Sequence, residues 1–90
     1  MRSAAWDPAK ARANLLKHGV RFSDAVGVLF DALAVTKEDT TAMGERRFVR
    51  VGTDYRGRVI VVVHTMESVS RIISARRATR KERRKYEEGV

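Results

Sequence analysis

The sequence predicts a small α+β domain, because helical patterns at both ends flank a central run of strand-like segments. From residue 33 to residue 77 the apolar period changes from helical to about two, which is the period of strands. Ninety residues suffice for one hydrophobic core, so we expect residues 1–90 to form a single domain. The expected order is two N-terminal helices, an antiparallel meander of three to four strands and a C-terminal helix.

The first helix is expected over residues 8–17. Asp7 is a suitable N-cap, Pro8 fits the first helical position, and Trp6 can pack on the following turn as a hydrophobic staple. Gly19 can end this helix in a left-handed conformation. Local signals therefore define both ends of the helix.

A second helix, capped by Ser23, is expected over Asp24–Phe30. Four strand-like segments follow, at residues 33–37, 46–53, 58–66 and 71–77. The run Val59–Val63 is apolar and β-branched throughout, which is typical of a central strand covered by helix on one side. Residues 79–82, Thr-Arg-Lys-Glu, form a capping-box sequence that begins a helix toward Tyr86.

The composition limits the possible functions. The chain has 19 Lys and Arg against 11 Asp and Glu, a net charge of +8, so we expect an anionic polymer or an acidic protein as its partner. Without cysteine it can form no disulfide, zinc-thiolate site or thiol nucleophile. Its apolar runs are too short for a membrane span and no signal region follows Met1, so we expect a cytoplasmic protein without a membrane partner.

Most of the excess charge lies near the C-terminus. Residues 71–90 carry eight basic and three acidic residues, a net charge of +5, as expected of a phosphate-contacting surface. The alternative is a solvated, charged helix end. Arg80 and Lys81 stand in the first turn of the predicted last helix, where cations oppose the helix dipole unless an anion binds nearby. This local conflict favours a functional site.

A site built from Arg, Lys, His and Glu suits metal-free cleavage of RNA, in which the neighbouring 2′-hydroxyl attacks phosphorus. The two histidines lie far apart in sequence and no phosphate-binding glycine loop is present, so we expect no metal and no cofactor. Arg76 is the first choice for the phosphate, through its bidentate fork, and the alternative is a surface ion pair with Glu82 or Glu45. Regular alternation places Ile72, Ser74 and Arg76 on one face of the last strand and Arg71, Ile73, Ala75 and Arg77 on the other.

Glu82 and His64 are the candidates for proton transfer. Glu82 can instead close the capping box, and His64, whose ordinary pKa of about 6.5 suits proton transfer, can instead bond to the backbone at a strand end. Lys17 and His18 end the first helix, where cations also complement the helix dipole.

The sequence resembles the BrnT toxins, the ribonuclease halves of type II toxin–antitoxin modules. The resemblance runs from Trp6 to Glu87 and is carried by Trp6-Asp7-Pro8, Lys10, Asn14, Lys17-His18-Gly19-Val20, Phe22, Ala25, Glu45-Arg46, Gly52, Arg71-Ile-Ile-Ser-Ala-Arg76, Glu82-Arg83 and Tyr86-Glu87. It implies a RelE-like α+β fold, metal-independent RNA cleavage that arrests translation, and inhibition by a BrnA antitoxin. In that family the antitoxin brings the DNA-binding domain, so this chain would contact DNA only indirectly.

The resemblance places the site on the last strand and the last helix. Together with the reasoning from the residues, it gives Arg71, Arg76, His64, Glu82 and Arg83 as the catalytic candidates. The RNA-binding candidates are Arg77, Arg80, Lys81, Arg84, Tyr86, Lys17 and His18. The alternative functions are a non-catalytic basic nucleic-acid-binding module and an inactive toxin descendant that only binds its antitoxin.

Overall fold

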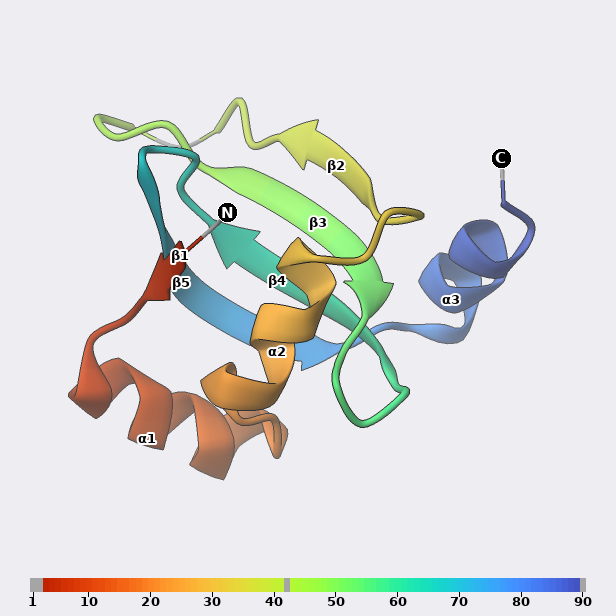
Figure 1. Ribbon diagram of the computed structural model, residues 1–90, viewed down its shortest axis with the longest axis horizontal. Coiled ribbons are helices and arrows are strands. Elements are labelled where there is room, and N and C mark those ends of the chain that lie inside the picture. The colour runs from red at the N-terminus through yellow and green to blue at the C-terminus, as the bar shows by residue number, and fades with distance from the viewer. Residues whose placement is uncertain (1–2, 42, 90) are drawn as a thin grey trace.

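A computed structural model describes residues 3–41 and 43–89 and shows, for these residues, three helices and five strands in an α+β arrangement (Figure 1). The elements in chain order are β1 (Ser3–Ala5), α1 (Pro8–His18), α2 (Phe22–Leu29), β2 (Val35–Glu38), β3 (Phe48–Thr53), β4 (Val59–His64), β5 (Val69–Arg77) and α3 (Arg80–Glu87). The strands form one sheet in the order β1-β5-β4-β3-β2. The predicted α+β class is confirmed, and β4 is the central strand as expected.

The predicted arrangement is wrong at the N-terminus. A short strand, β1, precedes α1 and pairs parallel with β5, Ala5 lying opposite Arg71, so the sheet is mixed and has five strands. Three residues carry no readable period, and this segment becomes a strand only because β5 offers it a free edge. The other neighbouring strands pair antiparallel, as the predicted meander requires.

Helix α1 has the predicted local signals at both ends. The Asp7 side chain accepts a hydrogen bond from the Ala9 amide at 2.8 Å, and Pro8 is the first helical residue. At the other end Gly19 adopts a φ of 69°, and its amide donates to the Leu15 carbonyl at 2.8 Å. Helix α1 therefore extends one residue beyond its predicted end, to His18.

The predicted start of the second helix is wrong. Helix α2 begins at Phe22, its N-cap is Arg21, and Ser23 lies inside the helix instead of capping it. Phe22 is fully buried in the core, and this packing draws the helix start forward without a side-chain cap. The next strand also begins later than predicted, at Val35, because Leu33 belongs to a turn in which its amide donates to Asp31.

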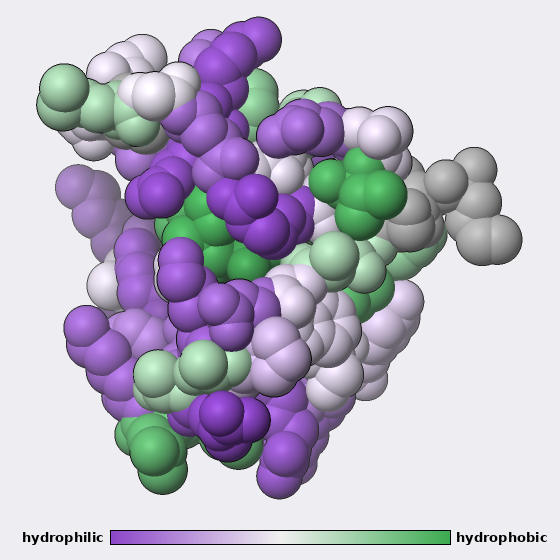
Figure 2. Space-filling model, turned by 90° about the vertical axis from the view of Figure 1, so that its left-hand side faces the viewer, coloured by the Kyte–Doolittle hydropathy of each residue, from purple (hydrophilic) through white to green (hydrophobic). Residues whose placement is uncertain are grey.

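The core lies between the sheet and the layer formed by α1 and α2. It contains Val20, Phe22, Ala25, Val28, Leu29, Ile60, Val62, Ile72 and Ala75. Trp6 packs edge-on against Phe22 with ring centroids 6.1 Å apart, so it joins the start of α1 to α2 as an apolar staple. Viewed from the side on which α1 begins, the surface is mostly hydrophilic with small hydrophobic patches between (Figure 2).

Strand β5 contains a bulge that reverses the predicted faces. Its register with β4 passes from Val63 opposite Ser74 to His64 opposite Ile72, so the pairing skips Ile73. One extra residue in a strand shifts the alternation of its side chains by one. Ile72 therefore lies on the opposite face from Ser74, although the two residues have the same parity in sequence.

The bulge places Arg71 and Arg76 on one face of the sheet. Ile72 and Ala75 are both buried beneath the helices. They are three positions apart, a spacing that would place them on opposite faces of a regular strand. Arg71 and Arg76 are their outer neighbours along the strand, so both belong to the other face. The prediction that these two arginines lie on opposite faces is wrong, because regular alternation does not hold through a bulge.

The second face of the sheet is only partly covered. Register places Arg76, Val61, Val51 and Val35 in one row across β5, β4, β3 and β2 on this face. Helix α3 lies beside it and contacts β3. A groove of about 210 Å³ separates the helix from the strands, lined by Val35, Lys37, Val49, Val51, Glu82, Lys85 and Tyr86. We call this side of the sheet the open face.

Candidate functional site

The junction between β5 and α3 is fixed by the predicted capping box. The Thr79 hydroxyl accepts from the Glu82 amide at 3.2 Å, and the Glu82 carboxylate accepts from the Thr79 amide at 2.8 Å. Because α3 begins at Arg80, only two residues separate it from the end of β5. The capping box thus holds Glu82 beside the last residues of the strand.

Arg76 and Glu82 form a two-pronged ion pair across this junction. Arg76 Nη1 donates to Glu82 Oε1 at 2.8 Å, and Arg76 Nη2 donates to Glu82 Oε2 at 2.9 Å. Their side chains remain 41% and 32% exposed, so a ligand can reach both groups from solvent. This ion pair is the alternative to phosphate binding that the sequence analysis gave for Arg76. The same geometry, with both Nη atoms facing one carboxylate, also suits a phosphate that accepts two hydrogen bonds.

The ion pair changes the acidity of both groups. The hydrogen bond from Arg76, helped by those from Thr79 and opposed by partial burial, lowers the pKa of Glu82 to about 2. The same contact raises the pKa of Arg76. Glu82 is therefore ionised at neutral pH, and while Arg76 holds it, it is a weak proton acceptor.

Arg71 lies at the far end of the open face and pairs with Glu45 from the loop before β3. It lies five positions before Arg76, at most about 16 Å along the strand at the usual rise per residue. The two guanidinium groups are held by different carboxylates, and their separation along the strand would let them contact different phosphates of one nucleic-acid strand. Both arginines have an anionic partner in the free chain.

The remaining cations of the C-terminal region are exposed. Helix α3 presents Arg80, Lys81, Arg83, Arg84 and Lys85 to solvent. These side chains can contact the phosphates of a nucleic-acid backbone on either side of Arg76. Arg77 is also exposed, but it pairs with Ile60 and so lies on the opposite face of β5 from Arg76.

His64 is not brought to the arginines. Its side chain is 1% exposed on the helix-covered face, in the row formed by Ile72 and Phe48. Its Nδ1 lies 2.8 Å from the Thr65 carbonyl oxygen, and its ring centroid lies 6.2 Å from that of Phe48. This geometry corresponds to the alternative in which the histidine bonds to the backbone at a strand end.

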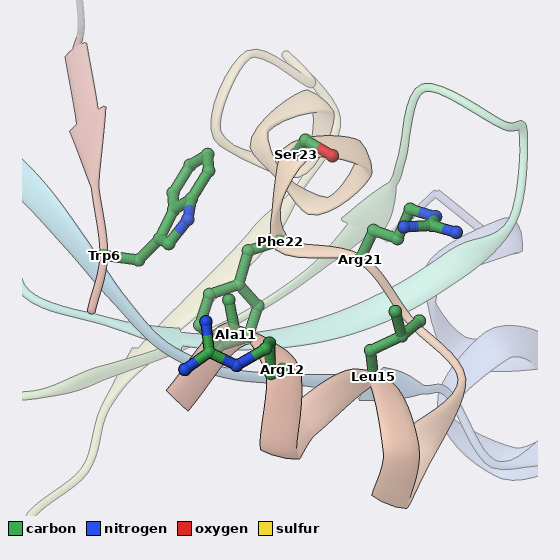
Figure 3. A pocket seen from close by; sticks show the side chains of 7 residues that line it. All are labelled: Trp6, Ala11, Arg12, Leu15, Arg21, Phe22 and Ser23. Atoms are coloured by element: carbon green, nitrogen blue, oxygen red, sulfur yellow. The ribbon is translucent and has the colours of Figure 1, made fainter. Parts of the chain in front are cut away.

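Lys17 and His18 also lie apart from the open face. They end α1, which packs on β5 from the helix-covered side. On that side a small pocket of about 180 Å³ lies between α1 and the start of α2, lined by Trp6, Ala11, Arg12, Leu15, Arg21, Phe22 and Ser23 (Figure 3). The sheet separates this pocket from Arg76.

Asn14 positions the strand that carries Arg76, a role not predicted from the sequence. Its amide nitrogen donates to the carbonyls of Val20 and Ala75 at 3.0 and 2.8 Å, and its oxygen accepts from the Ala75 amide at 3.1 Å. These buried bonds tie α1 to β5 at the residue before Arg76. The sequence offered no signal for this role, because the apolar pattern of the helix places Asn14 on its polar face, whereas in the structure Asn14 is buried and Leu16 is exposed.

Tyr86 lies on α3 one turn beyond Glu82, and its hydroxyl donates to Asp31. Asp31 was not among the candidate residues predicted from the sequence.

Within residues 3–41 and 43–89, no three His, Cys, Asp or Glu side chains gather closely enough to hold a metal ion. In the same part of the chain, none of the helices has the length and apolar character needed to cross a membrane.

The fold is similar to that of a solved toxin. The chain is similar to the 1.1 Å crystal structure of the Brucella abortus ribonuclease toxin BrnT, with a TM-score of 0.63 and 25% identity, covering 89% of this chain and 100% of that chain. These features define a protein of the ribonuclease-toxin class.

The family is shown by a match along most of the sequence. The family model described as "Ribonuclease toxin, BrnT, of type II toxin-antitoxin system" matches residues 6–82, and the chain belongs to this family. The resemblance stated from the sequence is thus confirmed. The match includes Arg71, Arg76 and Glu82 and ends before Arg83 and Tyr86. None of the curated proteins matches the chain.

Proposed function

We propose that this toxin is a metal-independent endoribonuclease, that it arrests translation in the cytoplasm, and that a BrnA-type antitoxin neutralises it. Membership of the BrnT family supports ribonuclease activity and an antitoxin partner. The observation that carries the proposed chemistry is the Arg76 fork, held by Glu82 beside the open face. An arginine in this place can stabilise a phosphate without a metal ion.

In the proposed reaction an RNA phosphate replaces the Glu82 carboxylate on Arg76, since both are bidentate acceptors. The released carboxylate no longer has the partner that lowers its pKa, so it becomes a better base. It takes the proton of the neighbouring 2′-hydroxyl, whose oxygen attacks phosphorus. The 5′-oxygen leaves with a proton from solvent, giving a 2′,3′-cyclic phosphate and a 5′-hydroxyl, while Arg76 stabilises the crowded phosphate.

The other candidate residues are proposed to hold the RNA. Arg71 would bind a phosphate at the far end of the open face, and Arg83 one beside the reacting group. Further contacts would come from Arg77, Arg80, Lys81 and Arg84, all of which are exposed. Tyr86, Lys17 and His64 have structural surroundings that explain their positions without RNA.

Cleavage of purified RNA in the presence of EDTA tests the proposal. We expect the wild-type chain and Arg12→Ala, an exposed arginine on α1, to cleave equally. Arg76→Ala should lose at least about 100-fold in rate, the usual effect of removing a group that stabilises transition-state charge. Binding without cleavage would instead identify a non-catalytic nucleic-acid-binding module. The absence of both binding and cleavage would identify an inactive toxin descendant. Cleavage that EDTA abolishes would refute metal independence.

Glu82→Gln separates the two roles of the carboxylate. Glutamine keeps the capping box but removes the charge that competes for Arg76. We expect RNA to bind more tightly and cleavage to slow by about 100-fold, because the proton acceptor is lost. An unchanged rate of cleavage would remove Glu82 from the reaction.

The partner is tested with the antitoxin. A basic site predicts an acidic antitoxin segment that covers it, so salt should weaken the complex, and an affinity independent of salt would contradict this. Operator-specific DNA binding should require the antitoxin. Induction of the toxin alone should stop growth and amino-acid incorporation, and Arg76→Ala at equal expression should not.

A further inference from the structure

Asp31 lies where the sheet lacks a strand partner. Strand β2 begins its pairing with β3 at Val35, opposite Val51, so Thr53 extends beyond it. The Asp31 carboxylate occupies this edge: Oδ2 accepts from the Thr53 amide at 2.8 Å, and Oδ1 accepts from the Leu33 amide at 2.9 Å. One side chain thereby joins the turn after α2 to the end of β3.

Gly52 provides the space for this carboxylate. A Cβ atom at Gly52 would lie 2.9 Å from Asp31 Oδ2, 3.0 Å from Ala34 Cβ and 3.1 Å from Val28 Cγ1. Any side chain at this position would force the carboxylate or its neighbours to move. Gly52 is among the residues that carry the family resemblance, and the sequence alone suggested no role for it.

Tyr86 connects the same carboxylate to α3. Its hydroxyl donates to Asp31 Oδ2 and lies 2.9 Å from Thr53 Oγ1, which can donate to the phenol oxygen in turn. Glu82 and Tyr86 are the half-buried residues of α3, and the others are exposed. They are four residues apart and so share one side of the helix. Two anchors therefore hold α3 to the sheet: Arg76 with Glu82, and Asp31 with Tyr86.

We propose that Asp31 is a positioning residue that, through Tyr86, fixes α3 and its cations beside Arg76. The proposal rests on the proposed function for its link to RNA cleavage, but the anchoring itself does not. Tyr86 acts in it as a structural donor, neither as a base nor as a stacking surface for RNA. Because α3 buries no residue fully, loss of this anchor frees the helix at its C-terminal end.

The acidities of the two groups agree with this assignment. Burial raises the pKa of Tyr86, and the hydrogen bond to Asp31 raises it further, so the phenol remains a donor at neutral pH. Burial opposes ionisation of Asp31, but hydrogen bonds from Tyr86, Thr53 and Leu33 lower its pKa overall. A neutral donor thus faces an ionised acceptor.

Amide hydrogen exchange of α3 tests the anchor. Tyr86→Phe removes the hydroxyl that contacts Asp31 and Thr53 and leaves Asp31 in place, so α3 amides should exchange about tenfold faster or more, while the Thr53 amide stays protected by Asp31. Asp31→Ala should expose both, and Asp31→Asn, which keeps an acceptor, should give an intermediate result. Asp39→Asn is the matched control, since Asp39 bonds to Thr41 in its own loop. Unchanged exchange of α3 in Tyr86→Phe would overturn the proposal.

A spectroscopic titration gives an independent readout. The chain has two tyrosines, and Tyr55 is 64% exposed, so Tyr55→Phe leaves Tyr86 as the single phenol. Its near-ultraviolet absorbance should titrate above the ordinary pKa of about 10, and adding Asp31→Asn should lower the midpoint. Circular dichroism over the same pH range verifies the fold. A midpoint unmoved by Asp31→Asn would refute the contact.

Cleavage kinetics then link the anchor to function. In Tyr86→Phe we expect kcat for RNA to fall about tenfold, with KM changing less than threefold, because every cation remains. If kcat is unchanged while α3 exchanges faster, the helix is anchored as proposed but its position is irrelevant to catalysis, and the link is refuted. If the wild-type chain does not cleave RNA, the proposed function fails, whereas exchange and titration still decide the role of Asp31.

Discussion

Replacing Glu82 with glutamine should remove a pH-dependent part of the stability of the protein. In the wild-type chain the carboxylate accepts two hydrogen bonds from Arg76 and one from the Thr79 amide. Glutamine occupies nearly the same volume and can keep the bond to Thr79, because capping boxes accept either residue. The substitution therefore removes the charge and leaves the helix start in place.

The magnitude follows from the acidity of Glu82. Its pKa falls from an ordinary 4.5 to about 2 through its bonds with Arg76 and Thr79, and one pKa unit corresponds to about 1.4 kcal/mol, so without solvent screening the whole shift would correspond to about 3 kcal/mol. Both side chains are about a third exposed or more, and solvent screens such pairs. We therefore expect Glu82→Gln to lose about 1–2 kcal/mol of unfolding free energy at pH 7.

The sign of the pH dependence is fixed by the direction of the pKa. A carboxylate whose pKa is lower in the folded state stabilises the protein above its unfolded pKa and loses this effect as pH falls. The difference in stability between wild type and Glu82→Gln should be full above pH 4.5. It should shrink below that value and vanish near pH 2.

Urea unfolding at several pH values measures this difference. Trp6 is the single tryptophan and packs against Phe22, so its fluorescence reports on the core. Glu87→Gln, an exposed carboxylate of the same helix, is the matched control and should show little change. A difference that persists undiminished to the acid end, or that is absent at pH 7, would refute the role assigned to the Arg76–Glu82 pair.

Three further outcomes follow from the same contacts. Asn14→Ala leaves buried groups of Val20 and Ala75 unpaired and should cost about 2–4 kcal/mol in urea unfolding; a loss below 1 kcal/mol would contradict this. Gly52→Ala should cost about 1–3 kcal/mol of unfolding free energy and speed hydrogen exchange at the Thr53 amide, because the added Cβ displaces Asp31. A Thr53 amide that stays protected would contradict this displacement. Arg71→Ala should weaken RNA binding. The slope of the logarithm of the binding constant against the logarithm of salt concentration should become shallower by about 0.7, the value for one phosphate of a single strand. An unchanged slope would exclude contact between Arg71 and a phosphate.

Elements with strong local signals were predictable from the sequence. Asp7, Pro8 and Gly19 define α1, and Thr79 with Glu82 defines the start of α3, because each signal acts within one turn of a helix. The central position of β4 followed from its continuous β-branched run. The start of α2 was mispredicted because the burial of Phe22, a tertiary contact, outweighed the capping preference of Ser23.

The candidate site was predictable where its parts are close in sequence. Arg76 and Glu82 are six residues apart across one short junction, so their pairing could be proposed before the fold was known. His64 is a candidate because its ordinary pKa suits proton transfer and because it ends the central strand, but neither property brings it to the arginines, and it shares the helix-covered face with Ile60 and Val62. Arg71 was placed on the wrong face because the bulge at Ile73 depends on the burial of Ile72 and Ala75.

The sequence by itself determined the α+β class, the helix ends that carry capping residues, and the concentration of positive charge over residues 71–90. Tertiary structure alone decided that β1 joins the sheet and that the bulge in β5 turns Arg71 and Arg76 to one face. It also brought Asp31, Thr53 and Tyr86 together. The physical reason is range: a cap or a β-branched run acts on its immediate neighbours, whereas these contacts join distant segments and stabilise the chain only after the core has packed.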